Sequence, residues 1–264
     1  MTPRNPAPMH YLDPAPHNPA PVLLLHGLGA TAASWEAQLP ALAHAGFRPI
    51  AVDLPGFGQT PHRGPWTPQR AAAAALALLE SLHALPAHIV GISMGGTVAL
   101  AAALDFPESV RSLVLVNTFA ALRRPDGLRG WAYFAFRMAL VHTLGLEAQG
   151  RVVAKRIFPK AGQEALRAAL LEEIRQADPR AYRAAMRALV RFDARPRLRE
   201  IRVPVLVVTG EEDTTVPPEV QRDLARGIPH ARQVIIPGAG HGIIADSPAA
   251  FNRTLLDFLL TPDT

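Results

Sequence analysis

The chain has 264 residues, of which 49% are hydrophobic and 19% are charged, so it can form a large buried core. It contains no cysteine, which excludes disulfide bonds and thiolate chemistry. No apolar run approaches the roughly 20 residues that span a bilayer, and residues 1–21 lack the apolar stretch of a secretory signal. We therefore expect a cytoplasmic protein without a membrane span.

The formal net charge of +5 is unevenly distributed. Residues Phe119–Glu200 contain 17 lysines and arginines against 8 acidic residues, whereas the rest of the chain contains 10 against 14. This positive charge either attracts anionic substrates or belongs to helix faces that simply contact water. Nucleic-acid-binding modules combine basic and aromatic residues in recognisable patterns, and none is present, so we expect no nucleic acid partner.

The first long strand is predicted at Val22–His26, after a short edge strand at Met9–Leu12. Its unbroken apolar run is typical of a central parallel strand and ends in His26-Gly27-Leu28-Gly29. A glycine-bearing loop at the carboxyl end of a strand can present main-chain N–H groups to a ligand, which makes the Leu28 N–H a candidate donor to an oxyanion. We expect His26 to hold this loop through a hydrogen bond rather than to transfer protons.

The next elements are a predicted helix at Ser34–Ala45 and a predicted strand at Arg48–Asp53. Asp53 stands beside a Pro-Gly turn, and we expect its carboxylate to cap that turn. Thr67-Pro68 predicts a helix start, because threonine is a favourable N-cap and proline fits the first helical position. This helix is expected to run to about Leu85.

Ser93 occupies the centre of a G-x-S-x-G pattern between a predicted strand at His88–Ile92 and a predicted helix at Thr97–Asp105. On such a turn the serine is strained and exposed, and the flanking glycines allow the strand and the helix to approach closely. The N-terminus of the helix favours developing negative charge near the hydroxyl. An ordinary Gly/Ser turn would explain the pattern alone, but the motifs that follow favour a nucleophile.

After a predicted strand at Ser112–Asn117, the alternation of strands and helices stops for roughly 80 residues, far longer than an ordinary connection. Asp178-Pro179 predicts the start of the last helix in this stretch. Apolar residues recur at three- and four-residue spacing, which indicates packing faces: Leu128, Trp131, Ala135 and Met138; Leu166, Leu170 and Ile174; Tyr182, Met186 and Leu189 or Val190. We predict a core formed by residues 1–118 and 200–264, with residues 119–199 inserted as a helical cap over the carboxyl edge of the sheet.

The sheet is predicted to resume with strands at Val203–Thr209 and Arg232–Ile236, separated by a helix at Pro218–Arg226. Asp213 follows the first of these strands and His241 the second. A closing amphipathic helix is predicted at Phe251–Leu260, and we interpret Asp246 as its cap. Glu211 and Glu212 are expected on a solvated turn.

Three strand ends thus offer a serine, a carboxylate and a histidine in the order Ser93, Asp213 and His241. With these motifs the sequence resembles the α/β-hydrolase superfamily over nearly its whole length, and most closely its small bacterial esterase and enol-lactonase-like branch. The matching stretches are His26-Gly27, Asp53–Gly58, Gly91–Gly95, Gly210–Asp213 and Gly240-His241. The resemblance implies an α/β fold with a mostly parallel central sheet, helices on both of its faces and an inserted cap.

The resemblance implies that Ser93 attacks a carbonyl carbon, that His241 accepts the serine proton, and that Asp213 orients and stabilises the imidazolium. The main-chain N–H groups of Leu28 and Met94 would hold the oxyanion. An acyl-serine would form and be hydrolysed by water, with no cofactor and no metal. The expected partner is a small ester-like molecule, and the sequence does not indicate an oligomeric state.

Other functions on the same fold remain open at this point. Serine at position 93 disfavours the aspartate chemistry of dehalogenases and epoxide hydrolases, and the absence of a tryptophan after His241 disfavours carbon–carbon bond hydrolysis. Acyl transfer to peroxide remains an alternative. So does a receptor that binds a small ligand without turnover, because a fold alone does not prove an activity.

Overall fold

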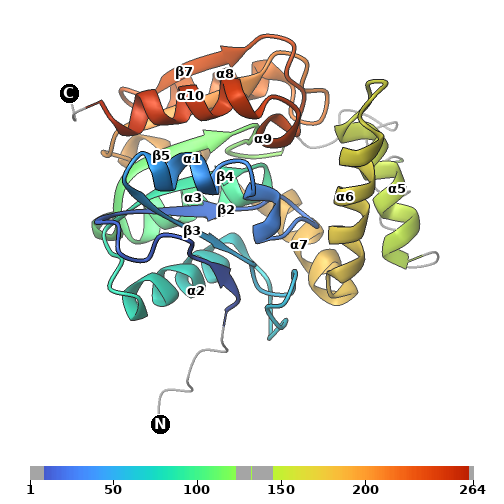
Figure 1. Cartoon of the computed structure of the whole chain (residues 1–264), viewed down its shortest axis with the longest axis horizontal. Coiled ribbons are helices and arrows are strands. Elements are labelled where there is room, and N and C mark those ends of the chain that lie inside the picture. The colour runs from blue at the N-terminus through green and yellow to red at the C-terminus, as the bar shows by residue number, and fades with distance from the viewer. Residues whose placement is uncertain (1–8, 123–131, 133–144, 262–264) are drawn as a thin grey trace.

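A seven-stranded sheet forms the centre of the molecule in the computed structural model, which describes residues 9–122, 132 and 145–261 (Figure 1). The strand order is β1-β3-β2-β4-β5-β6-β7. Of the described strands, only β1 runs antiparallel to its neighbour, so the predicted mostly parallel sheet is confirmed. The strands are β1 (Tyr11–Leu12), β2 (Ala20–Leu25), β3 (Phe47–Val52), β4 (Ala87–Ile92), β5 (Val110–Val116), β6 (Val205–Gly210) and β7 (Arg232–Ile236).

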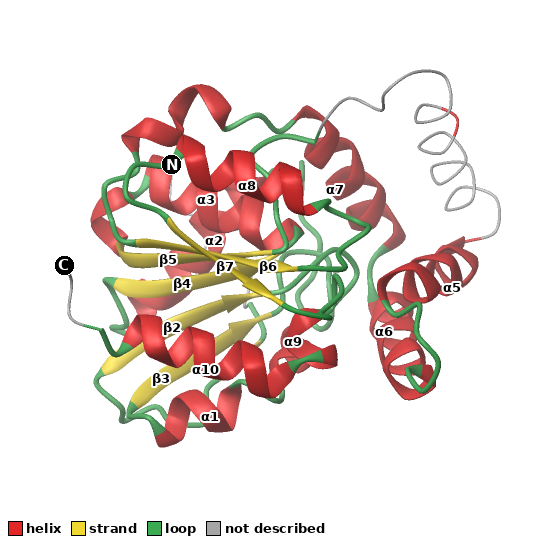
Figure 2. Ribbon diagram, turned by 90° about the horizontal axis from the view of Figure 1, so that it is seen from above, coloured by secondary structure: helices red, strands yellow, loops and turns green. Residues whose placement is uncertain are grey.

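Helices cover both faces of this sheet (Figure 2). One face carries α2 (Pro68–Ser81), α3 (Met94–Asp105) and α8 (Pro218–Gly227). The other carries α1 (Leu39–His44), α9 (Ile243–Asp246) and α10 (Pro248–Leu259). Among the described residues, no helix is both long and apolar enough to cross a membrane.

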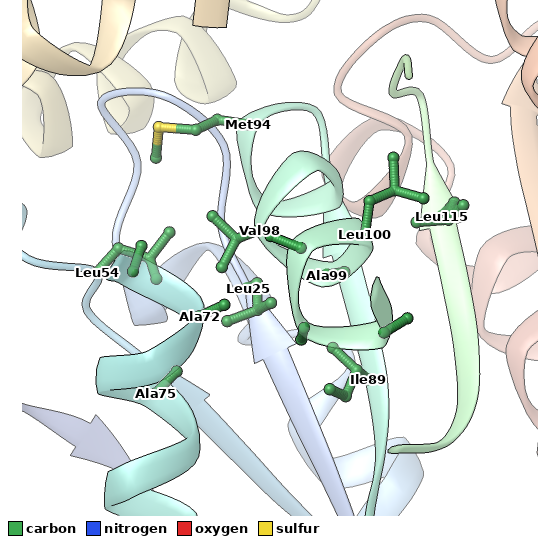
Figure 3. Close-up of a cluster of buried hydrophobic side chains, with 14 of the residues drawn as sticks. Leu25, Leu54, Ala72, Ala75, Ile89, Met94, Val98, Ala99, Leu100 and Leu115 are labelled. Atoms are coloured by element: carbon green, nitrogen blue, oxygen red, sulfur yellow. The ribbon is translucent and has the colours of Figure 1, made fainter. Parts of the chain in front are cut away.

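The alternation of side chains along the strands divides the core into two layers. Leu23 and Leu25 of β2 belong to the layer under α2 and α3, whereas Val22 and Leu24 belong to the layer under α1 and α10. In the first layer, small residues of α2 and α3 let these helices pack closely against the sheet (Figure 3). The close packing fixes α3, and with it the turn at Ser93 that precedes it.

Three described helices lie between β5 and β6 in the chain: α5 (Gly145–Ile157), α6 (Glu164–Gln176) and α7 (Pro179–Arg191). They lie beyond the edge to which the parallel strands point (Figure 2). The predicted start of α7 is confirmed, since the Asp178 side chain accepts a hydrogen bond from the Arg180 N–H.

The apolar stripe of α7 is confirmed by the burial of Tyr182, Met186 and Leu189. On α6, Ile174 is buried, while Leu166 and Leu170 are half-buried. The first predicted stripe, formed by Leu128, Trp131, Ala135 and Met138, lies outside the described residues.

Several element boundaries differ from the sequence prediction. The stretch predicted as one helix at Ser34–Ala45 contains a 3₁₀ turn at Ala32–Trp35 and then α1. Helix α3 begins at Met94 rather than Thr97, because the Ser93 carbonyl already accepts hydrogen bonds from the Gly96 and Thr97 N–H groups. Helix α10 begins at Pro248, three residues earlier than predicted.

Candidate active site

Ser93 lies on a strained turn between β4 and α3, with φ 53° and ψ −114°. Non-glycine residues rarely adopt positive φ, and such a conformation costs on the order of 1–3 kcal/mol, so the surrounding structure must enforce it. The Ser93 N–H donates to the Val116 carbonyl of β5 at 2.9 Å, which extends the sheet contacts of β4 into the turn. The side chain is half-buried rather than enclosed.

The glycines around Ser93 are required by close main-chain contacts. A Cβ atom on Gly91 would collide with the main chain of Gly95, and one on Gly95 would collide with the Leu25 carbonyl. The predicted reason for the G-x-S-x-G pattern, close approach of strand and helix, is therefore confirmed.

Asp213 and His241 meet although 28 residues separate them in the chain. The Nδ1 atom of His241 lies 2.8 Å from Oδ2 of Asp213, and both side chains are almost completely buried. This contact favours the tautomer in which Nδ1–H donates to the carboxylate, which leaves Nε2 as the proton acceptor of the ring.

The Asp213 carboxylate accepts further hydrogen bonds from the main chain and from one side chain. Its Oδ1 accepts from the N–H groups of Thr215 and Val216 at 2.8 and 2.9 Å. Its Oδ2 also accepts from Nε2 of Gln221 at 3.1 Å. Gln221 was not predicted from the sequence, since no motif links a glutamine on the next helix to the acid.

The other acidic residues near this loop have different contacts. Glu211 and Glu212 are exposed as expected: Glu211 accepts from the Gly238 N–H at 3.0 Å, and Glu212 pairs with Lys160 at 2.7 Å. The interpretation of Asp246 as a cap of the closing helix was wrong, because Asp246 ends α9 and Ser247 precedes α10.

The Asp246 carboxylate instead accepts from the Gly240 N–H at 3.1 Å, next to His241. Burial raises the pKa of this carboxyl above its usual range. Asp246 therefore supports the loop that carries His241, and the contact of His241 Nδ1 is with Asp213.

The two predicted oxyanion donors belong to main chain beside Ser93. Met94 is the first residue of α3, where N–H groups have no partner within the helix. The loop that carries Leu28 passes close by, because a Cβ added to Gly27 would lie 3.7 Å from the Ser93 Cβ. Within the part of the chain that the structure describes, neither N–H donates to a protein acceptor.

His26 and Asp53 have structural roles, as the sequence predicted. His26 accepts from the Leu54 N–H through Nε2 at 2.9 Å, and its Nδ1 lies 2.7 Å from the Gly27 carbonyl. Burial lowers the pKa of His26 to about 4, so it is neutral near pH 7. Asp53 accepts hydrogen bonds at 2.7–2.9 Å from the Ala32 and Gln59 N–H groups and lies 2.8 Å from His10 Nδ1.

The helices between β5 and β6 contact the loops on both sides of the site. Lys160, in the turn after α5, pairs with Glu212 and donates to the Gly238 carbonyl at 2.6 Å. Arg156 of α5 donates to the Thr214 carbonyl at 2.9 Å, next to Asp213. On the other side, Ile174 and Tyr182 lie against Gly29 in the loop that carries Leu28.

A cavity of about 370 Å³ lies between the loop at 60–67 and α2, lined by Trp66, Arg70 and Leu78 among others. Its lining includes none of Ser93, Asp213 and His241, so it is separate from the candidate site. Among the described residues, no cluster of histidine, aspartate and glutamate has the arrangement of a metal site.

Known proteins resemble this chain in sequence and in structure. A family model described as alpha/beta hydrolase fold matches residues 20–248. The chain is 34% identical to RutD of Variovorax paradoxus, which is named as a carbamate hydrolase, over 96% of each chain. It is also 34% identical to a pimeloyl-[acyl-carrier protein] methyl ester esterase of Neisseria meningitidis, over 90% of this chain and 93% of the other. The enol-lactonase of Burkholderia xenovorans superimposes over 96% of both chains with a TM-score of 0.87 and 27% identity.

Proposed function

Because this chain belongs to the α/β-hydrolase fold family and is a hydrolase, we propose that it cleaves a carboxylic ester, lactone or thioester through an acyl-serine intermediate. The observation that carries this proposal is the 2.8 Å contact between His241 Nδ1 and Asp213 Oδ2, in a molecule that also holds a serine on a strained strand-to-helix turn. An ordinary Gly/Ser turn does not require a buried histidine–aspartate pair.

In the first step, Ser93 Oγ attacks the carbonyl carbon while His241 Nε2 accepts its proton. Asp213 stabilises the imidazolium without taking the proton. The main-chain N–H groups of Leu28 and Met94 hold the oxygen on which negative charge develops. Loss of one such donor typically costs about 3 kcal/mol of transition-state stabilisation, so these two groups contribute much of the rate.

Collapse of the tetrahedral intermediate expels the leaving alcohol, which takes its proton from His241. Water then attacks the acyl-serine, with His241 as general base, and the acid is released. The same chemistry applies to an ester, a lactone or a thioester, since each presents an acyl carbon with an oxygen or sulfur leaving group. We favour an ester or a lactone, because a methyl ester esterase and an enol-lactonase are both among the similar proteins.

We also propose that residues 119–199 act as a helical cap on a core formed by residues 1–118 and 200–264. In support, α5 and the turn after it contact the loop that carries Asp213, and α6 and α7 contact the loop that carries Leu28. A segment in this place can select substrates and exclude water from the acyl-enzyme.

The test is covalent labelling with a fluorophosphonate probe followed by peptide mapping. We expect a single labelled residue, Ser93, and no labelling of Ser93→Ala. Turnover of a panel of esters and lactones then identifies the acyl group. A wild-type protein that binds small acids but neither reacts with the probe nor hydrolyses any ester would instead be a receptor.

A further inference from the structure

Asn117, the residue that follows β5, connects three strand ends through one buried side chain. Its Nδ2 donates to the carbonyls of Gly240 and His241, both at 2.9 Å. Its Oδ1 accepts from the Gly210 N–H at 2.8 Å, at the end of β6. Both N–H groups and the oxygen of the Asn117 amide are therefore hydrogen-bonded to main chain near His241 and near the loop that carries Asp213.

The backbone of Asn117 also has an uncommon conformation. Its φ is 44°, a value that asparagine tolerates better than most other residues. Its N–H donates to the Val208 carbonyl at 3.0 Å, so the main chain of Asn117 is fixed to β6 while its side chain contacts the loop that carries His241.

Thr118 makes the corresponding contact to the turn that carries Ser93. It is fully buried, and its Oγ1 donates to the Ser93 carbonyl at 2.6 Å. Its side chain also packs against the Cα of Gly96, where an added Cβ would meet it. The main chain of Ser93 is thereby tied to the residue after Asn117.

We propose that the dipeptide Asn117-Thr118 is a positioning element that fixes the distance between Ser93 and His241. One residue holds the main chain of the histidine and the next holds the main chain of the serine. Consecutive Cα atoms are held about 3.8 Å apart by a planar peptide, so the two attachments begin at points whose separation is fixed. This inference rests on the proposed function, because it assigns these two residues to the serine–histidine pair.

The expected effect follows from the sensitivity of proton transfer and attack to geometry. A misplacement of about 1 Å can lower the rate by roughly two orders of magnitude without changing substrate binding. Loss of either attachment should therefore lower kcat and the reactivity of Ser93, and should leave KM nearly unchanged, since both residues are fully buried.

The experiment compares Thr118→Val, which removes the hydroxyl at nearly constant volume, with Thr118→Ser, which keeps it. The matched control is Thr209→Val, because Thr209 is equally buried on the neighbouring strand and its hydroxyl contacts Gln233. We measure kcat, KM and the second-order rate constant of fluorophosphonate inactivation. The expected result for Thr118→Val is a fall of about tenfold or more in kcat and in the inactivation rate, with KM within about twofold. Thr118→Ser and Thr209→Val should both stay near the wild type.

Asn117→Asp gives a second readout that a merely structural role would not change. The isosteric carboxylate cannot donate to the two carbonyls, and its negative charge beside the histidine loop favours the imidazolium. We expect a lower kcat and an acidic limb of the kcat–pH profile displaced to higher pH. The control is Asn18→Asp, whose amide also donates to two carbonyls, those of Ala43 and Phe47, away from the site.

The outcomes separate this inference from the proposed function. If the wild type reacts at Ser93 but Thr118→Val has the same kcat and inactivation rate, the positioning role is overturned and the serine hydrolase stands. If the wild type does not react at all, the proposed function falls, and this inference falls with it. Should Thr118→Val fail to fold, Thr118→Ala compared with Thr118→Ser isolates the hydroxyl in the same way.

Discussion

Glu173 of α6 accepts a hydrogen bond from the main-chain N–H of Thr31, 142 residues earlier in the chain, at 2.7 Å. Thr31 is the N-cap of the 3₁₀ turn that follows the loop carrying Leu28. The contact therefore joins the proposed cap to the core beside the proposed oxyanion donors. Burial raises the pKa of Glu173 to about 7, and the negative charges of Asp53 and Glu36 act in the same direction.

This raised pKa predicts a pH-dependent stability. Glu173 has an ordinary pKa of 4.5, so between pH 4.5 and about 7 the unfolded chain releases a proton that the folded chain retains. Stability contributed by the protonated form is present below pH 4.5 and is lost as the pH rises to about 7. The loss should not exceed about 3 kcal/mol, and Glu173→Gln should not show it.

The measurement is the free energy of unfolding in urea at several pH values for the wild type and Glu173→Gln. As the pH rises from 4.5 to about 7, the free energy of unfolding of the wild type should fall relative to that of Glu173→Gln. Glu172→Gln is the matched control, because Glu172 is exposed and pairs with Arg175, so its curve should run parallel to that of the wild type. Parallel curves for Glu173→Gln as well would contradict the prediction.

Asp213→Asn should lower kcat by about four orders of magnitude, because an amide facing His241 Nδ1 favours the wrong imidazole tautomer. The variant should still fold, since its amide oxygen can accept from the N–H groups of Thr215 and Val216 as the carboxylate does. Steady-state kinetics and thermal unfolding of the same preparation check both parts.

Three further substitutions serve as controls for the acid. Glu211→Gln and Glu212→Gln should leave kcat nearly unchanged, because both side chains are exposed and neither contacts His241. Asp246→Asn should have at most a moderate effect, through the loop at Gly240. A collapse of kcat in Asp246→Asn with normal turnover in Asp213→Asn would transfer the role of the acid to Asp246.

The positive charge between β5 and β6 predicts a preference for anionic acyl substrates. Part of this charge is neutralised within the segment, since Arg151, Arg167 and Arg175 pair with nearby glutamates. Four arginines of α7 have no ion pair among the described residues: Arg180, Arg183, Arg187 and Arg191. The opposite, apolar side of α7 includes Tyr182, which lies against Gly29 beside the site.

We therefore expect kcat/KM for a carboxylate-bearing ester to exceed that for its neutral analogue at low salt and to fall as salt increases. Exposed charges are screened beyond roughly 10 Å at 0.1 M salt, so a steering effect must weaken over this range. The neutral ester measured in the same salt series is the control. Equal salt dependence of the two substrates, with the neutral ester preferred throughout, would contradict this prediction. The arginines would then be a helix face that simply contacts water, and the cap would select substrates by shape through its apolar side chains.

Local patterns in the sequence determined most of the fold. The strand at Arg232–Ile236 and the helix starts at Thr67-Pro68 and Asp178-Pro179 were predicted where the structure has them, because strand hydrophobicity and helix capping depend on residues within a few positions of each other. The turn at Ser93 was predictable for the same reason, since its glycines are needed within one strand–turn–helix unit.

Only the tertiary structure decided which distant groups touch. The contact of Asp246 with Gly240 and the burial of Glu173 against Thr31 both depend on where separate segments meet. The same holds for Asn117 and Thr118, which look like an ordinary strand end in the sequence. Hydrogen bonds between residues far apart in the chain leave no local periodicity, so their partners are fixed by the packing of the sheet and helices rather than by neighbouring residues.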